Sequence, residues 1–240
     1  MQKIEKKNVS RGLFWNILMV FVVMPATLLL FWKFGDRKYY LCSLVLIVIA
    51  MIPFFVGFEK RKPEPKELVT LAVMCAIAVA SRTAFIMIPH FKPMTAIIMI
   101  TGMAFGPQAG FMTGAMTGFV SNFIFGQGPW TPWQMFAYGV AGFLAGILAD
   151  KKIIGRKKRI ETAIFGGVIV IAVVGPFLDL CSVFTMGNEI TLEWVGAIFL
   201  SGLPVNAIHA TATVLTLLIF CKPMMEKLDR IKIKYGMMRD

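Results

Sequence analysis

The sequence predicts an all-α polytopic membrane protein, and three features of its composition support this prediction. Hydrophobic residues make up 58% of the 240 residues and charged residues only 16%, whereas an ordinary soluble domain carries about 25% charged residues. The mean hydropathy is +0.74. The apolar residues form long continuous runs instead of alternating with polar ones, which favours membrane helices over the strands of a barrel.

Eight apolar segments follow one another along the chain, and each is expected to form one membrane helix. A helix needs about 20 residues to cross the hydrocarbon core of a bilayer. The segments are 13–32, 39–58, 68–88, 94–106, 107–126, 132–150, 162–185 and 193–221. Because the fourth segment is short, we expect it either to thin the bilayer or to borrow residues across Gly106-Pro107.

The basic residues predict that both termini are cytoplasmic. With the N-terminus inside, 20 Lys and Arg residues fall in inside segments and four in outside loops, and membrane proteins concentrate these residues on the cytoplasmic side. The inside segments are 1–12, 59–67, 151–161 and 222–240, and the outside residues are Lys33, Arg37, Lys38 and Lys92. The same bias explains the net charge of +12 without a nucleic-acid partner.

A charged linker that contains Pro63 and Pro65 divides the chain, because proline interrupts a continuous helix. Residues 1–67 are expected to form an N-terminal two-helix membrane extension that ends in this linker. Residues 68–221 are expected to form a six-helix substrate-binding core, followed by a basic cytoplasmic tail at 222–240.

Small residues recur at helical spacing on two of the core segments. The alanine stripe is Ala72, Ala76 and Ala80, and the glycine stripe is Gly110, Gly114 and Gly118. Such stripes let another helix backbone approach closely. For the alanine stripe, packing within the chain and docking of a partner are both open interpretations.

Polar and aromatic residues gather in the predicted outer half of the membrane segments and indicate a ligand pocket that opens to the outside. Polar groups inside a membrane are expensive and usually functional, and pockets combine apolar walls with a few hydrogen-bonding groups. The stretch FGQGPWTPWQM at 125–135 is expected to form a re-entrant or capping loop over this pocket. The candidate substrate-binding residues are Arg82, Asn122, Gln127, Trp130, Trp133, Gln134, Asp179, Asn206 and His209.

Simpler roles for these residues are also open. An Arg82–Asp179 ion pair would only join two helices, and the tryptophans would only anchor the chain at the membrane interface. The sequence lacks a P-loop, an H-E-x-x-H motif and a G-x-S-x-G motif, so catalysis is not expected. An integral-membrane enzyme would depend on Asp179 and His209, and an autonomous secondary transporter is the other alternative. No cofactor or metal site is predicted.

The six-segment core resembles the membrane-embedded S components of energy-coupling factor (ECF) vitamin transporters. The resemblance covers residues 68–221 and is carried by the alanine stripe, the glycine-rich segment FGPQAGFMTGAMTGFVSNFIFG and the outer loops. It implies that the alanine face docks against a transmembrane coupling subunit and that two ATPase subunits supply energy. It also implies that the S component topples in the membrane to release a vitamin inside. The N-terminal pair of helices is absent from minimal members and could obscure the alanine face.

The resemblance also suggests which vitamin is carried. The tryptophan-rich stretch is similar to members associated with cobalamin uptake, so cobalamin or a related corrinoid ranks first among the expected ligands. Riboflavin and other aromatic vitamins or precursors follow. His209 is a candidate for contact with a corrinoid cobalt, against the alternative of a histidine that only packs between helices.

Overall fold

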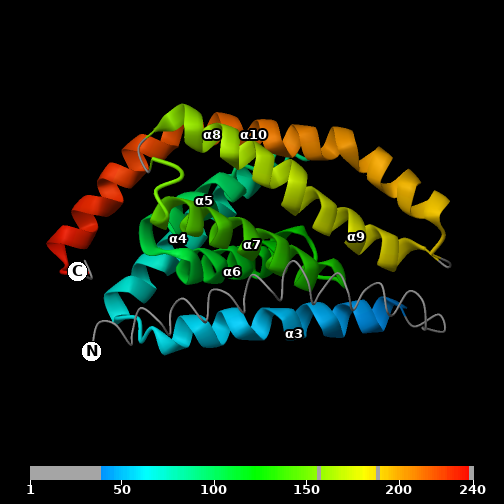
Figure 1. Cartoon of the computed structure of the whole chain (residues 1–240), viewed down its shortest axis with the longest axis horizontal. Helices are drawn as coiled ribbons and strands as arrows, with labels where there is room; N and C mark the ends of the chain where they lie inside the picture. Colours follow the sequence, from blue (N-terminus) through cyan, green and yellow to red (C-terminus); the bar gives the residue numbers. More distant parts are fainter. Residues whose placement is uncertain (1–38, 156–157, 188–189, 238–240) are drawn as a thin grey trace.

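A computed structural model describes residues 39–155, 158–187 and 190–237, and its regular elements are helices (Figure 1). The predicted segment 13–32 lies outside the described residues. The helices are α3 (Tyr39–Lys60), α4 (Pro65–Ala84), α5 (Met94–Phe105), α6 (Pro107–Phe125), α7 (Trp130–Asp150), α8 (Arg159–Ile169), the π-helical η2 (Val170–Val174), α9 (Gly175–Met186) and α10 (Leu192–Lys234).

The six predicted core segments correspond one to one to α4, α5, α6, α7, the continuous α8–η2–α9 rod and α10. Within the described ranges, five helices are long and apolar enough to cross a membrane, which confirms the predicted all-α polytopic membrane fold. Helix α3 runs along one face of the bundle, and α10 with the α8–η2–α9 rod covers the opposite face (Figure 1). Helices α5, α6 and α7 lie between these two layers.

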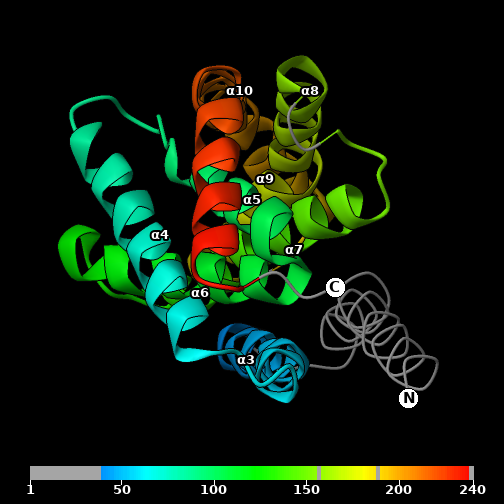
Figure 2. The ribbon, with the colours of Figure 1, turned by 90° about the vertical axis from the view of Figure 1, so that its left-hand side faces the viewer.

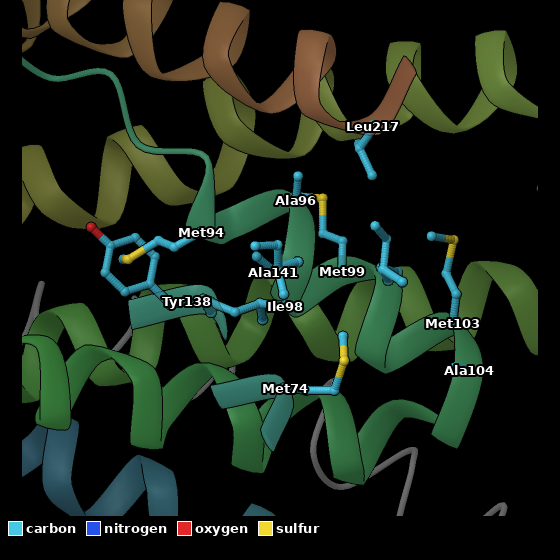
Figure 3. Packing of buried hydrophobic residues seen from close by; sticks show 14 of the residues in the cluster. Met74, Met94, Ala96, Ile98, Met99, Met103, Ala104, Tyr138, Ala141 and Leu217 are labelled. Carbon is cyan, nitrogen blue, oxygen red and sulfur yellow. The ribbon is translucent and has the colours of Figure 1, made fainter. Parts of the chain in front are cut away.

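Helix α5 is short because it lies inside the bundle. All 12 of its residues are buried, so its side chains pack on other helices instead of facing lipid (Figure 3). Gly106 ends the helix with φ at 91°, a left-handed conformation that glycine adopts without a steric penalty. Pro107 then occupies the start of α6, where its missing N–H is no loss. The chain therefore turns at Gly106-Pro107 and does not carry α5 across it.

The glycine stripe of α6 packs against α7, which confirms the predicted close approach of another helix. A Cβ added to Gly110 or Gly114 would collide with a backbone carbonyl of α7, and one on Gly118 would lie 3.1 Å from the Cα of Met135. Gly142 of α7 returns the contact, because a Cβ there would collide with the Gly110 carbonyl. Residues without side chains thus bring the two backbones together.

Aromatic side chains attach α3 to the core. The Phe54 ring stacks on Phe111 of α6 with a centroid distance of 3.9 Å and an interplanar angle of 11°. It also meets the edge of Phe143 of α7 at 5.0 Å. Helix α3 therefore packs on α6, α7 and α9. Helix α4 lies at the edge of the bundle with one side turned away from the other helices (Figure 2).

Helix α10 continues to Lys234 instead of ending at the predicted residue 221. Beyond that point, Met225 and Leu228 are buried on the inner face of the helix. The Lys232 ammonium donates a hydrogen bond to the Ala104 carbonyl and lies 4.7 Å from the centroid of the Phe105 ring. A cation at the C-terminus of a helix is favourable, so this part of the basic tail is held against the end of α5.

Candidate functional site

Arg82 lies at the centre of a polar network where α4 and α6 end. The side chain is buried, and one guanidinium nitrogen donates to Ser121 Oγ at 2.5 Å and to Asn122 Oδ1 at 3.1 Å. Its Cζ lies 4.1 Å from the centroid of the Phe125 ring. The last turn of α4 is thereby tied to the last turns of α6 by a buried cation.

The network continues into the start of α7. Asn122 Nδ2 donates to Thr131 Oγ1 at 3.0 Å, and the Thr131 hydroxyl donates to Gln127 Oε1 at 2.9 Å. Gln127 Nε2 donates in turn to the Phe119 carbonyl at 3.1 Å. Three candidate site residues, Arg82, Asn122 and Gln127, are therefore members of one hydrogen-bonded chain, which we call the Arg82 network.

Asp179 and Asn206 form a second polar contact, between α9 and α10. Asn206 Nδ2 donates to Asp179 Oδ2 at 2.8 Å. Each side chain fits over a glycine of the facing helix, because a Cβ on Gly202 would strike the Asp179 carboxylate and one on Gly175 would strike the Asn206 amide. This arrangement contradicts the Arg82–Asp179 alternative, since in the described ranges Arg82 bonds to α6 and Asp179 to α10.

His209 of α10 contacts α5 and α7. Its Nε2 lies 2.7 Å from Thr95 Oγ1 at the start of α5, and its ring meets the Tyr138 ring at a centroid distance of 6.2 Å and an angle of 74°. The start of α5, the first half of α7 and the first half of α10 therefore meet at His209 inside the bundle.

The tryptophan-rich stretch is not the loop that the sequence predicted. Only residues 126–129 separate α6 from α7, and Trp130–Gln134 form the first turn of α7. Trp133 is fully buried and stacks on Phe184 of α9 with a centroid distance of 5.9 Å. Trp130 stays 43% exposed, with its indole N–H donating to the Gly126 carbonyl at 3.3 Å. The loop interpretation was wrong because Gly126 and Pro129 already complete the turn.

Several residues of this region were not among the sequence candidates. Thr95, Ser121, Thr131 and Tyr138 are all buried and supply hydroxyl groups from three different helices. A hydroxyl near the end of an apolar segment was the signal that could have found them. Hydroxyls are too common in membrane helices for that signal to stand out without the fold.

The assembled side chains carry groups that form hydrogen bonds. They offer amide, hydroxyl, imidazole and guanidinium groups, beside apolar side chains such as Met94 at the start of α5. Over the residues that the structure describes, no group of three or more His, Cys, Asp or Glu could hold a metal ion. A largely apolar site with a few convergent polar groups is the usual form of a small-molecule site.

The alanine stripe faces outward. Ala72, Ala76 and Ala80 are exposed along α4, whereas Ala78 is fully buried. The described N-terminal helix, α3, packs on α6, α7 and α9 and leaves the alanine face uncovered. Packing against the described residues therefore does not explain this stripe.

A comparison with protein families agrees with this architecture. Residues 62–226 match the model of the ECF-type riboflavin transporter S component, and no solved structure matches the chain. Such S components are transporter subunits, not enzymes, and they work with a membrane coupling subunit and ATPases. Since the match covers α4 to α10 up to Glu226, this multi-pass membrane protein belongs to the ECF-type riboflavin transporter S component family.

Proposed function

We propose that this S component captures a flavin-type vitamin, with riboflavin as the first candidate, in a site that opens to the outside of the cell. The family match to a riboflavin-type S component over residues 62–226 is the observation that carries this proposal. The sequence ranking placed cobalamin first, but the match gives no support to a corrinoid. A flavin also needs no cobalt ligand, so His209 is proposed to donate or accept a hydrogen bond.

The proposed site lies between the Arg82 network and the Asp179–Asn206 pair. A flavin combines a planar ring system that suits an apolar slot with a chain of hydroxyl groups that needs hydrogen-bonding partners. His209 and Asn206 lie three residues apart and share one face of α10, where they are proposed to contact the ligand. Trp130 and Gln127 are exposed at the start of α7 and in the turn before it, and they are proposed as contacts at the entrance.

The coupling module is proposed to dock on the exposed face of α4. Alanine side chains at four-residue spacing allow a partner helix to approach the backbone closely. Val69, Val73 and Ile77 extend the same exposed region with apolar side chains. We propose that the coupling subunit covers this surface and that its ATPases drive release of the vitamin to the cytoplasm.

The proposed orientation predicts which loops can be labelled from outside. In a chain without its native cysteines, Met87→Cys is expected to react with a membrane-impermeant maleimide on intact cells. Lys152→Cys is expected to react only after permeabilisation. Met87 is 88% exposed in the turn after α4, and Lys152 is exposed in the turn after α7. The reverse pattern would place the site on the cytoplasmic side and exclude capture from outside.

Riboflavin binding tests the proposed ligand directly. The purified protein is expected to quench riboflavin fluorescence in a saturable titration and to leave cobalamin unbound. His209→Leu is expected to weaken riboflavin binding about tenfold, because one buried hydrogen bond to the ligand is lost. Thr211→Leu is the matched control, since Thr211 is exposed on the same helix and its hydroxyl, among the described residues, bonds only to the Ala207 carbonyl. Saturable binding of cobalamin but not of riboflavin would overturn the proposal.

A further inference from the structure

Two buried polar atoms on α7 have no hydrogen-bond partner in the part of the chain that the structure describes. They are the Tyr138 hydroxyl and Gln134 Oε1. Tyr138 is fully buried. Among the described residues, no polar group donates a hydrogen bond to its hydroxyl or accepts one from it. Buried polar atoms in native proteins are nearly always paired, so each exception requires an explanation.

The two atoms belong to one face of one helix. Gln134 and Tyr138 are four residues apart on α7, which places their side chains one above the other. Tyr138 lies beside Met94, and its hydroxyl points away from Met99 and Met103 (Figure 3). Its ring contacts His209. The Tyr138 hydroxyl therefore borders the proposed ligand site, and Gln134 lies one turn before it on the same face of α7.

The chemistry of the pair specifies what it can bind. The side-chain oxygen of Gln134 is an acceptor, while the Tyr138 hydroxyl can donate. A ligand that presents a donor next to an acceptor satisfies both when the Tyr138 hydroxyl donates. The imide edge of a flavin ring does this, because its ring N–H is flanked by carbonyl oxygens.

We infer that Gln134 and Tyr138 recognise the imide edge of the flavin ring. Gln134 Oε1 accepts a hydrogen bond from the imide N–H, and the Tyr138 hydroxyl donates to a neighbouring carbonyl of the ring. This inference rests on the proposed function. It makes Tyr138 a specificity-determining residue, since a site built to hydrogen-bond a ligand group strongly rejects ligands that lack the group.

The inference is tested with flavins that differ only at this edge. The parent protein is expected to bind 3-methylriboflavin at least tenfold more weakly than riboflavin, because the methyl group removes the N–H and leaves Gln134 Oε1 unpaired. In Gln134→Leu this difference is expected to disappear. Tyr138→Phe is expected to weaken riboflavin and lumiflavin alike, by about tenfold, since lumiflavin has the same imide edge without the sugar chain.

Thr113→Val is the matched control. The Thr113 hydroxyl is also buried without a partner in the described residues. It lies on α6, one turn before the Thr117 hydroxyl that contacts Cys75. The variant is expected to bind riboflavin like the parent. The comparison of 3-methylriboflavin with riboflavin on the parent needs no variant, so equal binding of the two would overturn the inference even if a substitution prevents folding.

The outcomes separate this inference from the proposed function. If riboflavin binds but methylation and Tyr138→Phe change nothing, the inference is overturned and the proposed function stands. An effect of Tyr138→Phe on riboflavin but not on lumiflavin would assign the hydroxyl to the sugar chain and also overturn it. If the parent binds no flavin at all, both proposals fail.

Discussion

Ala76→Trp is expected to abolish ATP-driven vitamin uptake while leaving riboflavin binding to the isolated S component unchanged. Ala76 is exposed at the middle of the alanine stripe, so an indole there displaces no side chain of the core. The same bulk prevents a partner helix from approaching the α4 backbone. Binding is measured by fluorescence titration of the isolated subunit, and uptake by proteoliposomes that contain the complete ECF complex.

Ala172→Trp is the control for this prediction. Ala172 is also exposed, but it lies in η2, on a rod that is not part of the proposed docking face. Its substitution is expected to leave both binding and uptake unchanged. Full uptake by Ala76→Trp would show that the coupling subunit docks elsewhere and would leave the exposed alanines without a role. Equal loss of binding and uptake would point to a folding defect instead.

The helices could be predicted from the sequence because their signals are local. Long apolar runs predicted the core helices, and Gly106-Pro107 marked the break between α5 and α6. The glycine stripe of α6 predicted a close neighbour, since few other reasons place glycines at four-residue spacing in a helix. The end of α10 was missed because Met225 and Leu228 alternate with charged residues, and only their burial against the bundle reveals that the helix continues.

The site was predicted less well because it depends on contacts between distant segments. Arg82, Asn122, Asp179, Asn206 and His209, which the sequence placed in the outer half of the membrane segments, are buried in the structure. Their partners were not predictable. Arg82 donates hydrogen bonds to Ser121 and Asn122 instead of pairing with Asp179, because α4 and α6 end side by side. The sequence contains both possibilities, and helix packing decides between them.

The different positions of the two tryptophans also could not be predicted from the sequence. In sequence they are equivalent residues of one stretch, and a loop would have exposed both to a ligand or to the membrane interface. Their three-residue spacing places both on one face of α7, but Trp130 is the first residue of the helix and Trp133 lies one turn further along it. Trp133 thereby points into the core and Trp130 stays 43% exposed. Only the start of the helix, which is a property of the turn at 126–129, separates their roles.

This difference predicts a large effect for one tryptophan only. Trp133→Ala is expected to lower the free energy of unfolding by about 3–5 kcal/mol, the range for removing a fully buried aromatic side chain from a core. Trp133 stacks on Phe184, so its removal also loosens the contact between α7 and α9. Trp130→Ala is expected to change the free energy of unfolding by less than about 1 kcal/mol, because nearly half of that side chain is already exposed. Unfolding in detergent, followed by the near-ultraviolet signal of the remaining aromatic residues, measures both variants.

Trp133→Phe provides the decisive comparison, because it keeps an aromatic ring against Phe184 while removing part of the volume. It is expected to lie between the parent and Trp133→Ala in stability, and to bind riboflavin like the parent wherever it is folded. If Trp133→Ala were as stable as the parent but bound riboflavin much more weakly, the indole would be a ligand contact and not a core residue. The stretch 125–135 would then serve the ligand through both tryptophans. The burial of Trp133 instead assigns the inner tryptophan to the stability of α7 and leaves Trp130 as the one aromatic side chain of the pair that a ligand can reach from outside the core.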